Sequence, residues 1–185
     1  MKTERDKMLA GAPYDPGDAD LRAERARSRS LCQRFNALPV ADAQGQALVL
    51  AELFGRLPPK LEINAPFFCD YGSNIELGRN VYFNYNCVIL DVARVRIGDY
   101  SLFGPGVHIY TALHPISAAD RRAGLESGKP VHIEADVWVG GGAIVCPGVT
   151  IGAGSVIGAG SVVTASVPAG VLAAGNPCRV IRSLG

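Results

Sequence analysis

Aliphatic side chains recur at a spacing of six residues over much of the second half of the chain. The unbroken series comprises Ile133, Val139, Val145, Ile151, Ile157 and Val163. Four residues after each of these positions stands a small or β-branched side chain: Val137, Ala143, Val149, Ser155, Ser161 or Val167. Self-similarity at a short fixed period indicates a repeat architecture, in which each repeat is one structural unit stacked on its neighbours.

A period of six argues against an amphipathic helix. At 3.6 residues per turn, each six-residue step rotates an apolar residue well away from the previous one. Gly140, Gly152 and Gly158 would also destabilise a helix interior by about 1 kcal/mol each. The pattern instead predicts short strands with glycine at the corners. Three such faces would close a triangular coil of roughly 18 residues, and coils would stack about 4.8 Å apart through parallel strand hydrogen bonds.

The same register appears upstream, so the repeat covers most of the chain. Its aliphatic and aromatic positions there are Leu77, Phe83 and Ile89 and, after a two-residue slip, Ile97, Phe103 and Ile109. We therefore predict an all-β core over residues 58–185, ending in a tail at 168–185. Residues 113–129 lack the repeat and are expected to form an extended loop that leaves the prism, since long loops in compact domains are usually functional or disordered.

Residues 1–57 have a different composition and are predicted to be a small helical domain. The segments Ala19–Leu38 and Ala41–Leu57 are rich in helix-forming residues, and Pro39 separates them. Their simplest role is to cover the first coil, which would otherwise expose an open parallel edge.

Charge and cysteine usage narrow the functional classes. Eighteen basic residues balance 17 acidic ones without clustering, so neither nucleic acid nor a membrane surface is an expected partner. No apolar run reaches the length of a membrane span, and no signal-peptide pattern follows the charged N-terminal residues. The five cysteines form no CxxC pair, which suits a reducing compartment. We expect a cytoplasmic protein with a small-molecule substrate.

His114 is the candidate catalytic residue because it stands where the repeat breaks off. A histidine titrates near neutral pH and can take a proton from a hydroxyl that attacks a thioester carbonyl. The residues alone leave an alternative open, namely a surface histidine that merely begins a mobile loop.

Several motifs together resemble the maltose/galactoside O-acetyltransferase family of hexapeptide-repeat acetyltransferases. The resemblance runs nearly from end to end and rests on Lys7–Gly11, Tyr14-Asp15, Asp70–Ile75, Asn84, Leu90–Val92, Thr111–Pro115, Asp136–Gly140, Pro147–Gly152 and Ala174–Arg182. The His-Pro site combined with the Asn-Pro-Cys-Arg tail is its most specific part. What the resemblance implies is a left-handed parallel β-helix, since the spacing does not determine the handedness.

The resemblance further implies an acetyl-CoA-dependent enzyme that acetylates a sugar hydroxyl, with maltose, glucose or a galactoside as the type of acceptor. His114 would be the general base for direct attack, and Asn84 would lie near the thioester. The expected assembly is a homotrimer with active sites at the subunit interfaces. The acceptor would contact residues at or beside Asp15, Asp70, Asp91, Val92 and Glu126, whose carboxylates can each accept two hydrogen bonds from sugar hydroxyls.

The resemblance also implies a coenzyme site and requires no metal. The pantetheine arm would contact Trp138, Gly141, Gly142, Ala159, Thr164 and Ala165. Arg179 and Arg182 would contact the phosphate end, a task that suits the guanidinium group. Ala165 stands where the family often has lysine, so we expect one of the family's phosphate contacts to be missing.

Two other functional classes remain as alternatives. A metal-dependent hydratase of the γ-carbonic-anhydrase type uses the same prism, and His108, His114 and His132 could supply three imidazoles. However, His108 and His114 are one repeat apart and therefore on adjacent faces, so they could meet only across a subunit interface. The second alternative is a non-catalytic β-helix that serves as a binding scaffold.

Overall fold

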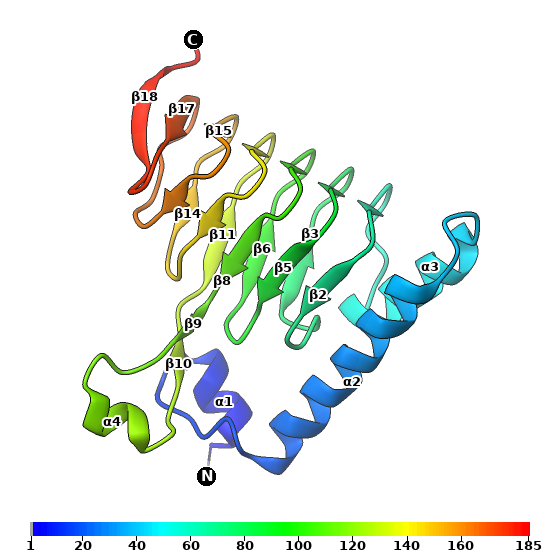
Figure 1. Ribbon diagram of the computed structural model, residues 1–185, viewed down its shortest axis with the longest axis vertical. Helices are drawn as coiled ribbons and strands as arrows, with labels where there is room; N and C mark the ends of the chain where they lie inside the picture. Colours follow the sequence, from blue (N-terminus) through cyan, green and yellow to red (C-terminus); the bar gives the residue numbers. More distant parts are fainter. Residues whose placement is uncertain (1) are drawn as a thin grey trace.

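Stacked triangular coils form the body of the molecule in the computed structural model, which describes residues 2–185 (Figure 1). The seven-stranded sheet contains β1 (Glu62–Ile63), β4 (Tyr82–Phe83), β7 (Leu102–Phe103), β12 (Trp138–Val139), β15 (Val156–Ile157), β17 (Val171–Ala174) and β18 (Arg179–Ser183). The five-stranded sheet contains β2 (Phe67–Cys69), β5 (Cys87–Leu90), β8 (His108–Tyr110), β13 (Ile144–Val145) and β16 (Val162–Val163). The four-stranded sheet contains β3 (Ile75–Leu77), β6 (Val95–Ile97), β11 (Val131–Ile133) and β14 (Thr150–Ile151).

The six-residue spacing places every repeat aliphatic on the inside of the prism. Coil stacks on coil in parallel, so that Ile133 pairs with both Ile97 and Ile151 and Val145 pairs with Ile109 and Val163. All members of the series from Ile133 to Val163 are buried, as are their small partners four residues later. The predicted parallel β-helix of hexapeptide repeats is confirmed, with its apolar core along the axis.

Aromatic rings fill the end of the prism next to the helices. Phe83 is stacked on Phe103 with ring centroids 4.5 Å apart, and it meets Phe67 edge-on at 5.7 Å. Phe54 of α3 (Ala43–Phe54) extends the series with an edge contact to Phe67 at 6.1 Å. α3 and the C-terminal part of α2 therefore share one continuous core with the prism, whereas the start of α2 and α1 pack in a second cluster with Tyr71 and Val92.

Local signals explain where the helices begin. Thr3 and Asp6 form a capping box at α1 (Glu4–Leu9), Asp18 caps α2 (Ala19–Ala37), and Asp42 caps α3. The two helices expected over Ala19–Leu38 and Ala41–Leu57 are present as α2 and α3, and α1 is an additional helix. Residue 1 of the predicted N-terminal segment lies outside the described residues. We propose the boundary at residues 57 and 58, between the end of α3 and the start of β1.

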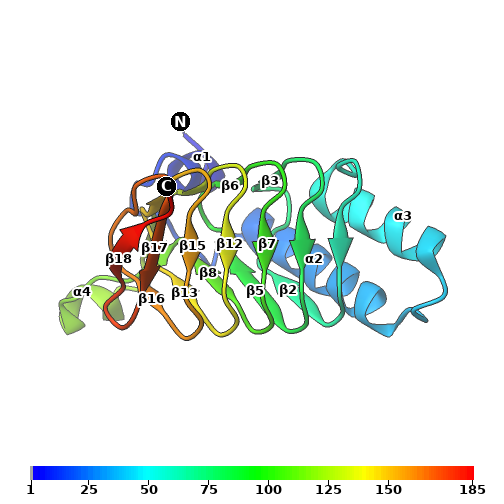
Figure 2. The ribbon, with the colours of Figure 1, turned by 90° about the horizontal axis from the view of Figure 1, so that it is seen from above.

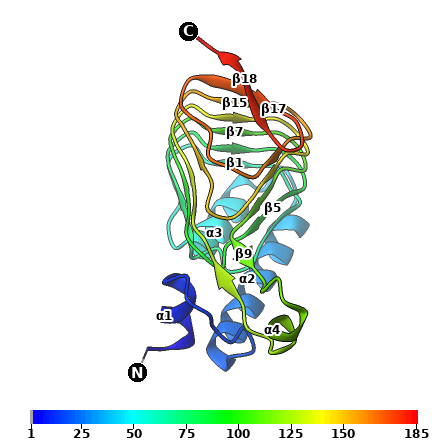
Figure 3. The same ribbon diagram turned by 90° about the vertical axis from the view of Figure 1, so that its left-hand side faces the viewer.

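The excursion at 113–129 has its own secondary structure. β9 (Ala112–Leu113) and β10 (Ser127–Gly128) form an antiparallel ribbon, and α4 (Ala118–Arg122) lies at its far end with Ser117 as its cap. Figure 3 shows this ribbon leaving one corner of the prism beside α1. The segment is thus an ordered arm in contact with the N-terminal helices.

The last coil ends in a different way from the first. β17 continues the parallel stack on β15, whereas β18 folds back antiparallel on β17 and lies exposed at the C-terminal end of the row (Figure 2). In the described part of the chain, no helix is long and apolar enough to cross a membrane.

Truncation of Phe83 tests the aromatic part of the core. Phe83→Ala is expected to lower the free energy of unfolding by about 3–5 kcal/mol, because the ring is fully buried between two others. The matched control is Phe68→Ala on the outer face of β2, where the ring is 47% exposed and the loss should stay below about 1 kcal/mol. Urea denaturation measures both values, and equal losses would contradict this account of the core.

Candidate active site

A polar cavity of about 270 Å³ lies where the arm leaves the prism. The N-terminal segment, α2, the end of β2, the end of β5 and the arm all contribute to its wall. Its lining residues are Tyr14, Pro16, Arg25, Arg29, Asp70, Tyr71, Leu90, Val92, Ala112, His114 and Glu126. The structure therefore brings together four of the residues that the sequence singled out, namely His114, Asp70, Val92 and Glu126.

His114 directly follows β9, and its imidazole is 57% exposed. Its Nδ1 atom lies 4.0 Å from Oε1 of Glu126, on the returning side of the arm. A carboxylate at this distance favours an orientation that leaves Nε2 free for a substrate. The antiparallel ribbon supplies this pairing, because it carries the outgoing and returning strands of the arm side by side.

Glu126 is itself held by Tyr14 of the N-terminal segment. The Tyr14 hydroxyl donates to Oε2 of Glu126 at 2.8 Å, and the two backbones exchange hydrogen bonds of 3.0 and 3.1 Å. Burial, together with the Glu126 carboxylate, raises the pKa of Tyr14, so its hydroxyl remains a donor. This chain of contacts orients the carboxylate beside His114.

Arginines of α2 complete the opposite wall. Arg25 donates to the Tyr71 hydroxyl at 2.6 Å and to the carbonyl of Pro16, and its guanidinium lies 5.7 Å from the centre of the Tyr71 ring. Burial raises the pKa of Asp70, whereas the nearby charges of Arg25 and Arg29 act in the opposite direction. Sequence reasoning missed both arginines, although their spacing of four along a helix places them on one face.

Asp91 forms the structural floor beneath this cavity. Its side chain is fully buried, and Oδ1 accepts hydrogen bonds from the backbone N–H groups of Asp70 and Tyr71 at 3.0 and 2.9 Å. The second oxygen, Oδ2, has no partner among the described residues. Burial raises the pKa of Asp91 to about 7, despite the hydrogen bonds from Tyr71 and Asn74, which lower it.

Two of the predicted acceptor residues do not reach the cavity. Asp91 lies beneath its wall, and Asp15 is exposed, with Oδ1 accepting a hydrogen bond of 2.7 Å from the N–H of Gly17. Both neighbour cavity residues in sequence, which explains why the motif alone did not separate them from the lining.

The predicted coenzyme residues are divided between two edges of the prism. Asn84, Gly141, Gly142 and Ala159 lie at the corners that lead from the seven-stranded sheet into the five-stranded sheet. Thr164 and Ala165 follow β16 and lie at the opposite edge of the five-stranded sheet, the edge from which the arm with His114 departs. One chain alone therefore does not gather these residues around a single ligand.

Open space adjoins the coil corners next to Gly141. Gly142 and Gly160 both have left-handed backbone angles, and a Cβ atom added at either would meet no atom within 4 Å. Asn84 accepts a hydrogen bond from the N–H of Tyr85 through Oδ1 at 2.8 Å, which leaves its amide NH₂ group directed elsewhere. These residues fit a thin ligand that runs along the coil corners.

The remaining coenzyme candidates are exposed. Trp138 lies on the outer face of the seven-stranded sheet between Leu102 and Val156, with 55% of its surface exposed. Arg179 and Arg182 belong to β18 and donate only to the backbone carbonyls of Cys178 and Ser183. Within residues 2–185 neither guanidinium takes part in an ion pair, so both can reach an anionic ligand.

The three histidines occupy separate places. His108 faces outward on the five-stranded sheet and bonds to the hydroxyl of Tyr110, while His132 faces outward on the four-stranded sheet. Across residues 2–185, no group of three or more histidine, cysteine, aspartate or glutamate side chains is arranged to hold a metal ion. The three imidazoles named for the hydratase alternative are therefore not gathered at one place within residues 2–185.

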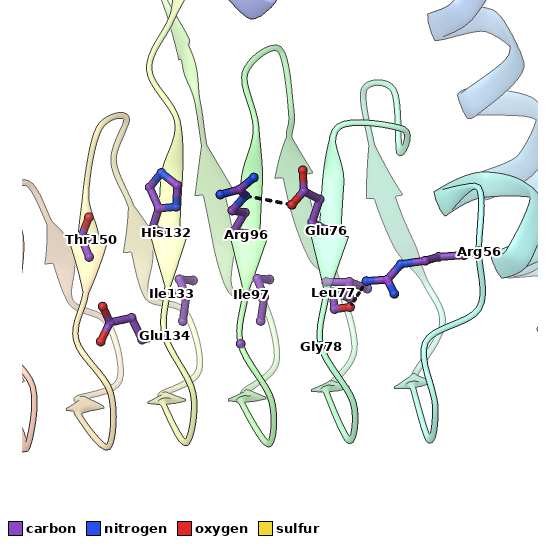
Figure 4. Close-up of a pocket in the computed structure, with 11 residues that line it drawn as sticks. Arg56, Glu76, Leu77, Gly78, Arg96, Ile97, His132, Ile133, Glu134 and Thr150 are labelled. Atoms are coloured by element: carbon purple, nitrogen blue, oxygen red, sulfur yellow. Dashed lines mark hydrogen bonds and ion pairs between the residues drawn. The ribbon is translucent and has the colours of Figure 1, made fainter.

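A second groove, of about 550 Å³, runs along the outer face of the four-stranded sheet and contains His132 (Figure 4). Its charged side chains already have partners within the protein. Glu76 binds Arg96 at 2.8 Å and Arg94 at 2.9 Å, and Glu134 accepts from the N–H of Ala153 at 2.8 Å. His132 is the one imidazole that lines this groove, and among the described residues it has no carboxylate partner of the kind that Glu126 is for His114.

Two family models match separate parts of the chain. Residues 7–58 match the maltose acetyltransferase hexapeptide capping motif, and residues 130–165 match six repeats of the bacterial transferase hexapeptide.

Similar proteins cover the whole chain. Nodulation protein L of Rhizobium meliloti (strain 1021) is 48% identical over 97% of this chain and 98% of its own length. A crystal structure of a maltose O-acetyltransferase from Clostridium difficile 630 is 44% identical, with a TM-score of 0.98 over 100% of this chain and 98% of that one. A hexapeptide-repeat acetyltransferase from Vibrio cholerae O1 biovar eltor, complexed with acetyl coenzyme A, is 39% identical, with a TM-score of 0.92 over all of both chains.

Replacement of Asp91 by asparagine should flatten the pH dependence of stability. The folded protein keeps a proton on Asp91 up to about pH 7, whereas the unfolded chain releases it near an ordinary pKa of 3.8. The wild-type protein therefore loses up to about 4 kcal/mol of stability as pH rises through this window, and the loss ends above it. Asp91→Asn removes this loss while its side-chain oxygen still accepts the two backbone N–H groups.

Urea denaturation at about pH 5 and about pH 8 measures this effect as the difference between wild type and variant. Asp91→Ala is the control: it also lacks the titrating group and should share the flat pH dependence of Asp91→Asn, but it loses the acceptor and should be less stable than Asp91→Asn at both pH values by about 1–3 kcal/mol. A difference between wild type and Asp91→Asn that does not change with pH would contradict the raised pKa.

Proposed function

Because the chain belongs to the maltose/galactoside O-acetyltransferase family of hexapeptide-repeat acetyltransferases, we propose that it transfers an acetyl group from acetyl-CoA to a sugar hydroxyl. The observation that carries the proposal is the position of His114 in a polar cavity next to Glu126. Acetyl-CoA supplies an activated acetyl thioester, as it does for enzymes of this kind, and the acceptor supplies the nucleophilic oxygen.

His114 acts as the general base in this proposal. Its free imidazole nitrogen takes the proton from the acceptor hydroxyl as that oxygen bonds to the thioester carbonyl carbon. When the carbon–sulfur bond breaks, the same proton passes from the imidazolium to the departing sulfur, so His114 returns to its starting form. Glu126 is oriented by Tyr14 and stabilises the imidazolium during the step.

The walls of the cavity suit a polar acceptor. The carboxylates of Asp70 and Glu126 accept hydrogen bonds from hydroxyl groups, and the guanidinium groups of Arg25 and Arg29 donate them. A volume of about 270 Å³ lies at the lower end of the range for small-ligand sites. A sugar or another compact alcohol with several hydroxyls is therefore the preferred class of acceptor.

We propose a homotrimer whose active sites lie between neighbouring copies. Two different edges would meet at each interface. One copy would contribute the edge with Asn84, Gly141, Gly142 and Ala159, and the next copy the edge with His114, Thr164 and Ala165. Each interface would then contain one complete set of catalytic and coenzyme-binding residues. In that arrangement the Asn84 amide could donate to the negative charge that develops on the carbonyl oxygen. The division of these residues between two edges of one prism supports this assembly.

The coenzyme would extend from this interface toward the C-terminal end of the prism. Trp138 offers an exposed ring along the way, and Arg179 and Arg182 would bind the phosphate end. Ala165 provides no charge at the position where the family often has lysine, so the two arginines of β18 carry more of the phosphate binding.

The role of His114 can be tested by its replacement with alanine. His114→Ala is expected to lower the turnover number about 10²–10⁴-fold, because the base is lost while the prism core remains untouched. Release of the CoA thiol over a panel of sugar acceptors measures turnover, and calorimetry measures acetyl-CoA binding, which should remain. His132→Ala on the four-stranded sheet is the matched control and should retain activity; unchanged turnover in His114→Ala would refute the proposal.

Mixed oligomers test whether two chains share one site. His114→Ala and Asn84→Ala chains should each be impaired alone, but unfolding and refolding them as an equal mixture should restore about a quarter of the wild-type activity. The restored fraction follows from random assortment, because a complete interface needs His114 from one variant and Asn84 from the other. If oligomers shown to contain both variants recover no activity, His114 and Asn84 act in a site formed by one and the same chain, and the shared-site proposal is wrong.

A further inference from the structure

Two thiols meet where α2 crosses the first coil. Cys32 lies in the C-terminal half of α2 and Cys69 ends β2, and their sulfur atoms are 3.9 Å apart. Both side chains are buried, and the hydroxyl of Ser28 lies 3.4 Å from the sulfur of Cys69. Cys87, by contrast, donates to the carbonyl of Gly104 and has no thiol partner in the described chain.

A cavity gives small molecules a path to this pair. It measures about 300 Å³ and is lined by Arg29, Cys32, Gln33, Phe68, Cys69, Asp70, Val88 and Leu90. Arg29, Asp70 and Leu90 also line the candidate acceptor cavity. The thiol pair is therefore adjacent to the proposed acceptor site, although it takes no part in the proposed acetyl transfer.

The two thiols differ in acidity. The hydrogen bond from Cys69 lowers the pKa of Cys32, and this effect outweighs burial. The same hydrogen bond, together with burial, raises the pKa of Cys69 well above its usual range. Cys32 is thus suited to react as the thiolate, with Cys69 as the neighbouring thiol that completes the reaction.

We propose that Cys32 and Cys69 form a reversible disulfide when the protein meets a two-electron oxidant such as hydrogen peroxide, and that this bond alters the acceptor cavity. The pair is the only one of its kind among the described cysteines, all of which are free thiols. Intracellular disulfides of this type usually act as transient redox sensors.

The reaction balances in two steps. The Cys32 thiolate attacks one oxygen of hydrogen peroxide, which forms a sulfenic acid and releases hydroxide. The sulfur of Cys69 then attacks the sulfur of the Cys32 sulfenic acid. The hydroxyl group of the sulfenic acid leaves as water with the proton of the Cys69 thiol, and the disulfide forms. Overall, two thiols and one hydrogen peroxide give one disulfide and two waters. The sulfur atoms must approach by roughly 2 Å, which rotation about the side-chain bonds and a small shift of α2 can provide.

The consequence for the acceptor cavity follows from the chain positions of the two cysteines and rests on the proposed function. Asp70 directly follows Cys69, and its N–H group is bound to the buried Asp91. Arg29 lies one helical turn before Cys32 on α2. A bond that pulls α2 toward β2 moves both cavity residues, whereas the edge with Gly141 and the arginines of β18 lie elsewhere on the prism.

The first test needs the full chain and hydrogen peroxide. Oxidation should reduce the number of titratable thiols from five to three and lower the mass by two hydrogens, and dithiothreitol should reverse both changes. Trypsin should then release residues 30–34 linked to residues 61–79, since each peptide contains one cysteine of the pair. Cys32→Ser should prevent this link, and Cys146→Ser should lose one thiol but retain the link.

The proposal is wrong if all five thiols remain titratable at a peroxide dose that oxidises dithiothreitol. It is also wrong if the disulfide forms between other cysteines. The second readout is kinetic: oxidation should raise the KM for the acceptor about fivefold or more while acetyl-CoA binding by calorimetry changes less than about twofold. An unchanged acceptor KM in the linked protein would refute the effect on the cavity. If the reduced protein transfers no acetyl group, the proposed function fails, and the thiol count still decides whether the disulfide forms.

Discussion

Parallel hydrogen bonds between successive coils are the constraint on which the rest of the structure depends. The N–H of Gly98 donates to the carbonyl of Ile133 and that of Gly104 to the carbonyl of Val139, both at 2.8 Å. A Cβ atom at either glycine would lie 2.5 Å from the backbone of the next coil. Because the coils are so closely stacked, the edges of the prism are straight, and residues far apart in sequence stand in line along them.

The candidate site combines an edge of the stacked coils with two segments that lie outside the repeat, namely the arm and the N-terminal segment. The arm holds His114 and Glu126, and the N-terminal segment holds Tyr14 against them. Asp91 links two successive coils beside this site, since it directly follows β5 and its buried carboxylate accepts from the backbone N–H groups that follow β2. A buried acid with one unpartnered oxygen costs stability when it is ionised, which indicates that the shape of the cavity floor matters more here than maximal stability.

The prism could be predicted from the sequence because each repeat carries one inward-facing aliphatic residue. The regular spacing of these residues along the chain is enough to identify the repeat. The break in the repeat also marked where the arm begins, next to His114. The sequence could not show that Arg25 and Tyr71 share a wall, because that contact joins segments 46 residues apart. Nor could it distinguish the buried Asp91 from the cavity residue Asp70, since the motif places both near the acceptor and only packing separates them. The assignments of the coenzyme residues and of the trimer remain predictions.

The antiparallel fold-back of β18 on β17 has a consequence for how such a chain can evolve. The coils that follow β14 contribute nothing to the acceptor cavity, yet they set how far Arg179 and Arg182 stand from it. Duplication or loss of one such coil would shift the arginines by about 4.8 Å along the rod and leave the cavity walls unaltered. In the proposed coenzyme site, the number of coils would therefore set the length of cosubstrate that spans from the cavity to these arginines, and natural variation in that number would be limited by the dimensions of the cosubstrate.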